Sequence, residues 1–158
     1  MNKLKKTPKQ YRAEAEINFV NGFNCAQAVF ITFSDELGFD RETALKISSS
    51  FGGGMGRLRE VCGAVSGMLM VLGMRYGYTS AEATDEKMEL YRKVQDVAAR
   101  FKEKNQTIVC RELLDIKIKG ADSPIPEART PEYYKKRPCA RFVGDAAEIT
   151  AKFIEENG

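Results

Sequence analysis

The sequence predicts an all-α fold, in which a single domain of about six to seven helices surrounds a buried, glycine-rich central helix. Apolar residues recur at helical spacing along most of the chain, and no segment alternates with a period of two over a useful length. The 158 residues form one domain and are enough to bury a substantial core. Residues 61–74 hold no charged side chain, so we expect them to form the central helix, with Cys62 in its first turn.

Capping residues and glycines delimit the helices expected in the first half of the chain. These helices cover residues 9–20, 24–37, 40–51 and 61–74. Asn24 and Asp40 are typical N-caps, because their side chains can accept hydrogen bonds from free N–H groups of the first turn. Gly22 and Gly38 follow the ends of helices, where glycine readily takes a left-handed conformation. The residues before the first helix, 1–8, are expected to form a flexible basic tail.

In the second half, Ser80 is predicted to start the longest helix, which runs to Lys104 with an apolar stripe on one face. Thr107 is a plausible cap for a short helix that contains Cys110. The stretch 117–130 has no period and contains two prolines, so it is predicted to be a surface loop. A short turn starts at residue 131, and the last helix begins at 138–139.

The composition excludes several classes of function. The chain contains no histidine, which removes the commonest general base, the commonest metal ligand and every Ser-His or Cys-His nucleophile. The net charge of +3 is too small to indicate a polyanionic partner. The apolar run 61–74 is shorter than the roughly 20 residues that span a bilayer, so no membrane insertion is expected. No export signal is apparent at the N-terminus, and we expect a cytoplasmic location in which the four cysteines serve as thiols, metal ligands or redox groups.

A glycine-rich segment, residues 52–56, precedes the predicted central helix. Such a segment before a helix can bind a phosphate through free N–H groups, but the sequence fits neither common phosphate-binding pattern. A flexible connector is therefore favoured over an anion site. The segment could also bring backbone close to a group held by Cys62, and Gly53, Gly54, Gly56 and Gly63 are for this reason candidate cofactor-binding residues.

The four cysteines share one predicted position, the first turn of a helix: Cys25, Cys62, Cys110 and Cys139. A helix N-terminus carries free N–H donors and partial positive charge, which stabilise a thiolate and lower its pKa. Arginines lie close in sequence to three of these cysteines: Arg57 and Arg59 before Cys62, Arg111 after Cys110, and Arg137 and Arg141 around Cys139. Cys62 in particular is expected to titrate below the usual value.

Three interpretations of the cysteines remain open. In the first, the four cycle between thiols and disulfides, for which lowered pKa values and the lack of histidine are suitable. In the second, they are thiolate ligands of an iron–sulfur cluster or another metal ion, since four cysteines are a standard ligand set. In the third, they are buried structural residues of a non-enzymatic helical module. The spacing contains no C-x-x-C pair, so neither a zinc ribbon nor a thioredoxin-type motif is present.

The residues 62–67, Cys-Gly-Ala-Val-Ser-Gly, together with single cysteines at 25, 110 and 139, resemble the C-GCAxxG-C-C family of proteins named for redox activity. The sequence Gly22-x-Asn24-Cys25 and the glycines at 52–56 make the resemblance more specific. It extends from about Phe19 to Ala147, most of the chain. It implies four functional cysteines on an all-helical fold and a bacterial or archaeal source.

The sequence does not name a partner. The segment 133–137 is rich in tyrosine and basic residues, but its short length and the neighbouring Glu132 favour a solvated loop, and we expect no nucleic-acid binding. A redox partner or a small molecule is implied by the redox interpretation, and a homodimer is compatible with exposed apolar side chains on the first helix. We further expect Cys25 and Cys62 to lie within reach of each other, with at least one other cysteine nearby.

Overall fold

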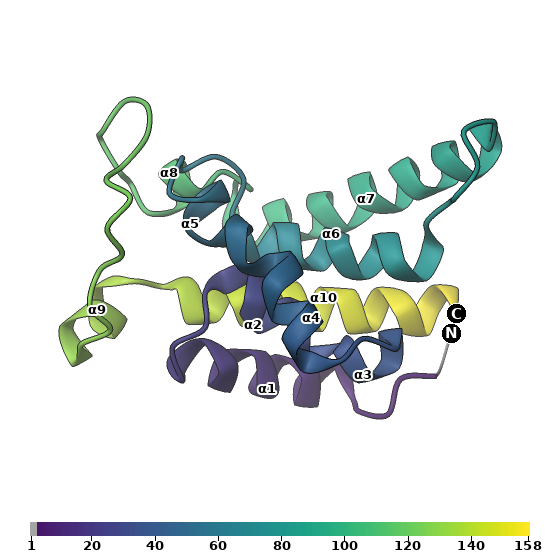
Figure 1. Ribbon diagram of the computed structural model, residues 1–158, viewed down its shortest axis with the longest axis horizontal. Coiled ribbons are helices and arrows are strands. Elements are labelled where there is room, and N and C mark those ends of the chain that lie inside the picture. The colour runs from purple at the N-terminus through teal and green to yellow at the C-terminus, as the bar shows by residue number, and fades with distance from the viewer. Residues whose placement is uncertain (1–2) are drawn as a thin grey trace.

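The computed structural model describes residues 3–158 and confirms the all-α, single-domain fold (Figure 1). The helices have these bounds: α1 Pro8–Val20, α2 Cys25–Thr32, α3 Ser34–Leu37, α4 Arg41–Ser48, α5 Gly52–Met55, α6 Gly63–Tyr76, α7 Thr84–Asn105, α8 Cys110–Leu113, α9 Pro131–Lys136 and α10 Cys139–Asn157, with a 3-10 turn η1 at Ser49–Phe51. Within residues 3–158 the β-structure is limited to an isolated antiparallel bridge between Val61 and Val109.

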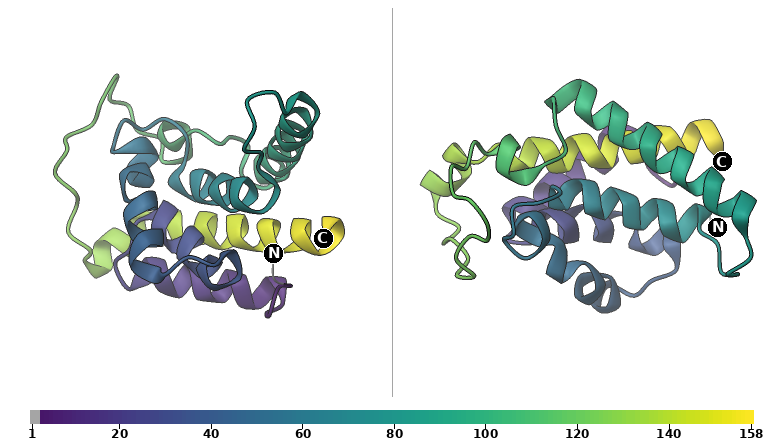
Figure 2. Two further views of the ribbon diagram at one scale, coloured as in Figure 1. Left: turned by 45° about the vertical axis from the view of Figure 1, so that its right-hand side comes forward. Right: turned by 90° about the horizontal axis from the view of Figure 1, so that it is seen from above.

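The long helices form layers. In Figure 1, α1 lies below α10, and α6 and α7 lie above it, while α2 and α4 cover the front. Figure 2 shows the same order from two other directions and shows α7 crossing over α6 and α10. The helices α6 and α10 start near the end of the bundle from which the loop between α8 and α9 projects. The C-terminal end of α10 lies at the opposite end.

Local hydrogen bonds explain the helix starts that the sequence predicts. Asn24 accepts a hydrogen bond from the N–H of Gln27 at 2.9 Å, and the Gln27 side chain returns one to the backbone of Asn24. Asp40 caps α4 through the N–H of Thr43, also at 2.9 Å. The predicted caps Asn24 and Asp40 are therefore confirmed, as are the loop over 117–130 and the start of the last helix.

Three predicted boundaries are wrong, each for a local reason. The longest helix begins at Thr84 and not at Ser80, because the Ser80 hydroxyl and carbonyl accept hydrogen bonds that close a turn before it. Thr107 accepts a hydrogen bond from the N–H of Val109, and Val109 itself is the N-cap of α8. The predicted helix 24–37 is broken at Phe33 into α2 and α3.

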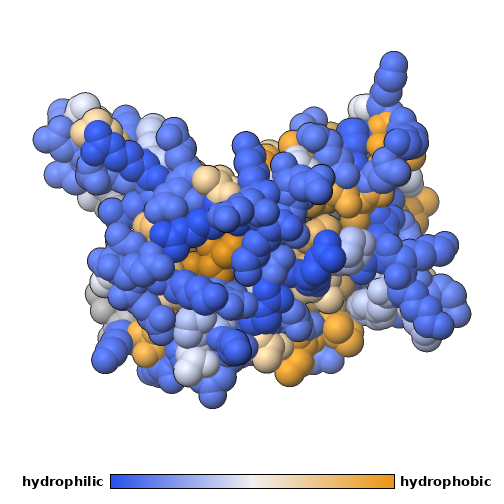
Figure 3. Space-filling model, turned by 180° about the vertical axis from the view of Figure 1, so that it is seen from behind, coloured by the Kyte–Doolittle hydropathy of each residue, from blue (hydrophilic) through white to orange (hydrophobic). Residues whose placement is uncertain are grey.

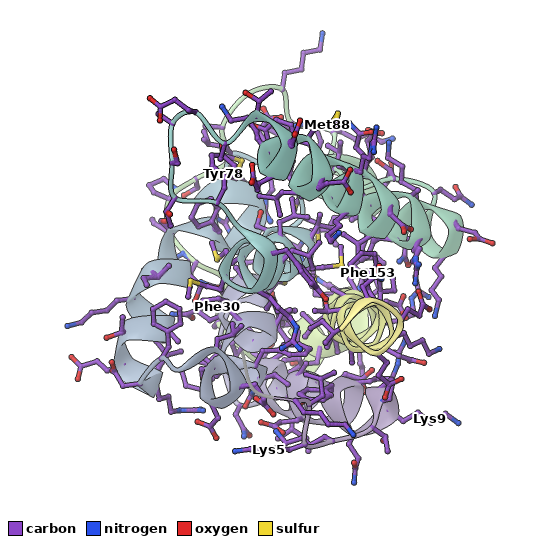
Figure 4. The ribbon with its side chains drawn as sticks, turned by 90° about the vertical axis from the view of Figure 1, so that its right-hand side faces the viewer. Lys5, Lys9, Phe30, Tyr78, Met88 and Phe153 are labelled. Atoms are coloured by element: carbon purple, nitrogen blue, oxygen red, sulfur yellow. The ribbon has the colours of Figure 1, made fainter. Side chains whose placement is uncertain are left out.

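The core is shared between α2, α6 and α10. The glycine-rich helix α6 buries its first three turns against α2, where a Cβ on Gly67 would lie 2.8 Å from the carbonyl oxygen of Ala26. Its last turn is less buried: Gly73 has open space around it and Met74 is 39% exposed. The apolar face of α10 includes Phe153, which points from α10 towards α6 and α7 in Figure 4.

Charged residues connect α1 to α10. The Arg12 guanidinium of α1 forms ion pairs with Asp145 and Glu148 of α10. Gly144 makes room for this contact, because a Cβ there would meet the side chains of Arg12 and Glu16. This ion-pair cluster therefore joins the first and last helices at one place along their contact.

Residues 3–7 precede α1, which begins at Pro8. The backbone N–H of Lys5 donates to the Tyr11 hydroxyl, and Lys6 pairs with Glu14, so this part of the predicted tail lies against α1. Met1 and Asn2 lie outside the described residues. In the part of the chain that the structure describes, no helix combines the length and the apolar character needed to cross a bilayer. The rear face is mostly hydrophilic, with apolar residues exposed in recesses between charged ones (Figure 3).

Candidate functional site

The four cysteines come together at the end of the bundle where α2, α6, α8 and α10 begin. Cys25, Cys110 and Cys139 are each the first residue of a helix, and Cys62 is the N-cap of α6, one residue before the position expected for it. All four line one pocket of about 210 Å³. None of the four is in a disulfide, and all but the half-buried Cys25 are buried.

The bridge between Val61 and Val109 places two of the cysteines side by side. The N–H of Cys62 donates to the carbonyl of Ile108 at 2.8 Å, and the N–H of Cys110 donates to the carbonyl of Glu60 at 2.6 Å. In such a pairing Cys62 and Cys110 are diagonal neighbours on the same face, with Cβ atoms of the order of 7 Å apart. A short extended pairing therefore positions the starts of α6 and α8 relative to each other.

Glycines allow the helix ends to approach closely. A Cβ on Gly63 would lie 3.1 Å from the Cβ of Cys25, and one on Gly54 would lie 2.6 Å from the Cβ of Cys110. Of the predicted glycines, Gly53, Gly54 and Gly63 line the pocket, together with Gly52, whereas Gly56 lies outside it. The glycines thus make space for cysteine side chains.

The chain from α5 to the start of α6 has an unusual backbone that orients two arginines. Gly53 and Gly54 have φ values of 69°, and the non-glycine residues Met55, Arg57 and Arg59 have φ values of 69°, 66° and 60°. Left-handed conformations cost a non-glycine residue about 1 kcal/mol or more, and they persist where the surrounding structure enforces them. Here they direct the Arg57 and Arg59 side chains into the pocket wall.

Cys25 and Cys139 form a hydrogen-bonded pair of thiols. The hydrogen bond from Cys25 lowers the pKa of Cys139, as do the nearby guanidinium groups of Arg137, Arg129 and Arg59. The same hydrogen bond, together with burial, raises the pKa of Cys25 well above its usual range. The pKa values of the two thiols are therefore shifted in opposite directions, and Cys139 loses its proton more readily than Cys25.

The other two thiols are protonated. Burial raises the pKa of Cys62 to about 12, although the N–H groups of Ala64 and Val65 partly counteract it. Burial also raises the pKa of Cys110, against the hydrogen bond from Arg59. The prediction that Cys62 titrates below the usual value is wrong, because loss of water around the sulfur outweighs the helix N-terminus.

Three of the arginines do not act on the cysteine nearest to them in sequence, whereas Arg137 lowers the pKa of Cys139 as its position indicates. Arg59, 4% exposed, donates to the sulfur of Cys110 at 3.7 Å and pairs with Asp122 at 3.0 Å. The Arg111 guanidinium instead donates to backbone carbonyls, including that of Leu58 at 3.0 Å. Arg141 is exposed and lies over the ring of Phe142 rather than in the cysteine pocket.

Two further arginines close the pocket from the side of α9. Arg129 is fixed by hydrogen bonds to the carbonyls of Phe19 and Phe23 and stacks over the Phe19 and Tyr133 rings at 4.4 and 4.9 Å. Arg137 forms an ion pair with Glu127, which also lines the pocket. The sequence did not indicate that Arg129, Glu127 and Tyr133 line the cysteine pocket, since they lie in segments predicted to be a surface loop and a short turn. For Arg137, the proximity to Cys139 in the sequence indicated a place in the site.

Metal ligation requires several ligand atoms around one point. Within residues 3–158, no three side chains of the types Cys, Asp and Glu are arranged to hold a metal ion. One of the four thiols, Cys110, already accepts a hydrogen bond from a guanidinium, which opposes direct approach of a cation. The cysteines as arranged here therefore do not fit an iron–sulfur cluster or a four-thiolate metal site.

Comparison with known proteins gives one result. No curated protein and no solved structure matches the chain. The model of one protein family, described as "Putative redox-active protein (C_GCAxxG_C_C)", matches residues 23–153, a region that contains all four cysteines and every residue that lines their pocket except Phe19. The resemblance seen in the sequence is thereby confirmed, and the chain belongs to the C_GCAxxG_C_C family.

Proposed function

We propose that the protein is a thiol–disulfide redox protein in which Cys139 is the nucleophile and Cys25 is its resolving partner. The observation that carries this proposal is the pocket in which Cys25 and Cys139 lie together among guanidinium groups, with a hydrogen bond between them that lowers the pKa of Cys139. A thiolate beside positive charge is the reactive form of cysteine, and a second thiol within reach completes a disulfide.

The pair can reduce a disulfide R–S–S–R in two steps. The Cys139 thiolate attacks one sulfur, a Cys139–S–S–R bond forms, and R–S⁻ leaves. That thiolate takes the proton of Cys25, and the resulting Cys25 thiolate attacks the Cys139 sulfur and releases the second R–S⁻. The two cysteines lose two electrons and form a disulfide, while the substrate gains two electrons and becomes two thiols in total, one of them still ionised.

Cys62 and Cys110 face the same pocket as protonated thiols. They have to lose a proton before they can attack a disulfide, so the first step belongs to Cys139. We assign them to the same site as a second pair of thiols, whose two members are held near each other by the bridge between Val61 and Val109.

The test is to oxidise the reduced protein with a mild thiol oxidant such as diamide, block the remaining thiols and map the products by mass spectrometry. The expected first product is a Cys25–Cys139 disulfide. It should still form in a Cys62→Ser variant and be lost in Cys25→Ser and Cys139→Ser. Formation of a Cys62–Cys110 disulfide as the only first product would contradict the assignment.

A second measurement addresses metal ligation. Protein purified without oxygen should be colourless, and elemental analysis should find less than one metal ion per chain. Visible absorbance bands that disappear in Cys139→Ser would instead assign the cysteines to a cluster and overturn the proposal.

A further inference from the structure

The walls of the cysteine pocket combine positive charge with apolar surface. Four guanidinium groups line it, those of Arg57, Arg59, Arg129 and Arg137, and the carboxylate that lines it is Glu127. Asp122, just outside, pairs with Arg57 and Arg59. After both carboxylates are counted, the four arginines still exceed the acidic residues, and they would do so even with a thiolate on Cys139.

Apolar side chains line the same cavity as these charges. They include those of Leu113, Leu114, Pro126 and Phe142. Such a surface gains nothing from an inorganic oxyanion, which is hydrated on all sides, but it favours the carbon skeleton of an organic molecule. The pocket therefore selects for a ligand that is anionic in one part and apolar in another.

The nucleophile is recessed. The exposed fraction of Cys139 is 7%, and its sulfur is reached through the pocket. A disulfide on the surface of another folded protein has to meet a thiolate that projects, whereas a small molecule can enter a cavity. The volume of about 210 Å³ is below the roughly 300–1,000 Å³ of pockets for drug-sized ligands. Both facts point to a compact substrate.

We propose that the substrate of this site is a small organic disulfide that carries carboxylate groups, with Arg137 as the residue that recognises its negative charge. This inference rests on the proposed function and adds the substrate class to it. Arg137 is suited to the role because it immediately precedes the Pro138–Cys139 start of α10, lines the pocket, and is balanced by the single ion pair with Glu127. The other three guanidinium groups each have several fixed partners within the fold.

The test compares two small disulfides that differ in charge, dithiodiglycolate and hydroxyethyl disulfide, as oxidants of the reduced protein. The rate of Cys25–Cys139 disulfide formation is measured for each, and the ratio of the anionic to the neutral rate is the readout. The ratio cancels any change in Cys139 reactivity, since both reagents meet the same thiolate. Arg137→Gln should lower the ratio about tenfold, the factor expected for loss of one charge-assisted hydrogen bond. Glu127→Gln should raise it.

Arg141→Gln is the matched control, because it removes the same charge from the start of α10 outside the pocket. Its ratio should equal that of the unaltered protein. Equal ratios in all four proteins would overturn the proposal. A second pair of reagents, iodoacetate and iodoacetamide, reports the same preference by alkylation of Cys139 without any redox step.

The two reagent pairs separate the possible failures. If neither disulfide oxidises the cysteines while iodoacetate still shows the preference that depends on Arg137, the proposed redox function is wrong and the substrate class falls with it. If both disulfides react but neither pair shows a preference that depends on Arg137, only the substrate class is wrong. Finally, sulfate and succinate are compared as protectants of Cys139 against iodoacetamide; equal protection by sulfate would contradict an organic ligand.

Discussion

The two pairs of cysteines share one pocket but differ in what their neighbours do to them. Cys25 and Cys139 come from α2 and α10 and share a hydrogen bond that lowers the pKa of Cys139 and raises that of Cys25. Cys62 and Cys110 are brought together by backbone hydrogen bonds, and burial keeps both protonated. Every one of these cysteines is at the N-terminus of a helix, so the helix end alone does not decide which thiol ionises. The decisive factors are burial and the identity of the group that faces the sulfur.

The largest effect is expected from Gly54→Ala, which acts on the Cys62–Cys110 side. The added Cβ would lie 2.6 Å from the Cβ of Cys110 and 2.9 Å from the Cα of Arg59, at a residue with φ of 69°. Left-handed strain and overpacking together should lower the free energy of unfolding by about 2–4 kcal/mol. Denaturant titration measures this. Unchanged stability would show that α5 and α8 can move apart, and the contrast between the two pairs would then lose its structural basis.

The second prediction concerns the pH dependence of alkylation. Because the pKa of Cys62 is raised to about 12 while that of Cys139 is lowered, Cys139 should become reactive at lower pH than a free thiol, and Cys62 only at strongly alkaline pH. At pH 7 the thiolate fractions differ by more than about a thousandfold, and the weaker nucleophilicity of the more acidic thiol offsets about half of that on a logarithmic scale. Cys139 should therefore react more than about thirtyfold faster with iodoacetamide.

Peptide mapping after short exposures to iodoacetamide gives the alkylation rates of Cys62 and Cys139. The exposures cover roughly pH 5 to pH 10, a range that includes the usual thiol pKa of about 8.5. Cys25→Ala is the informative variant, because removal of the hydrogen-bond donor should raise the pKa of Cys139. Equal rates for Cys62 and Cys139 in the unaltered protein would remove the distinction between the pairs.

The third prediction tests the arginine that faces Cys110. Arg59→Gln removes the guanidinium that lowers the pKa of Cys110 against the effect of burial, so this pKa should rise further and Cys110 should react more slowly at any pH below it. Cys62 should change little, since Arg59 is not among the groups that shift its pKa. A parallel slowing of Cys62 would indicate general rearrangement instead of a specific contact.

Much of the fold follows from local chemistry. The caps at Asn24, Asp40 and Thr130 involve partners only three residues away, so their effect is visible in the sequence. Ser80 and Thr107 also have hydroxyl or short polar side chains, but each accepts a hydrogen bond from an N–H only two residues ahead, within a turn. The helices that follow them therefore begin further along the chain than predicted. What separates the two groups is the hydrogen bond that each side chain finally makes, which a propensity argument does not specify.

The site was predictable only as a set of residues. The four cysteines could be identified as site residues because all of them are predicted at helix starts. Their pairing could not be predicted, because the hydrogen bond between Cys25 and Cys139 joins residues more than a hundred positions apart. Arg59 is close to Cys62 in sequence and yet faces Cys110, because a left-handed backbone and the Val61–Val109 bridge turn it there. Long-range pairing of this kind depends on the packing of whole helices, which no short pattern encodes.

The smallest effect on stability is expected from Gly63→Ala, which acts on the Cys25–Cys139 side. The new Cβ would lie 3.0–3.1 Å from the carbonyl oxygen of Phe51, the backbone nitrogen of Ala26 and the Cβ of Cys25, so these neighbours must move by a few tenths of an ångström. The gain of up to about 1 kcal/mol from replacing glycine in a helix offsets much of that cost, and the net change should stay below about 1 kcal/mol.

The effect of Gly63→Ala on chemistry should be larger than its effect on stability, because a displaced Cys25 no longer donates well to Cys139 and the pKa of Cys139 rises. The measurements are thermal unfolding and the rate of Cys139 alkylation at pH 7. Gly73→Ala, on the same helix but with open space around the new Cβ, is the control, and it should raise stability slightly and leave alkylation unchanged. If alkylation slows in Gly63→Ala while the melting transition stays intact, the glycine serves the reactive pair. If stability and reactivity fall together, the glycine serves only the packing of α2 on α6.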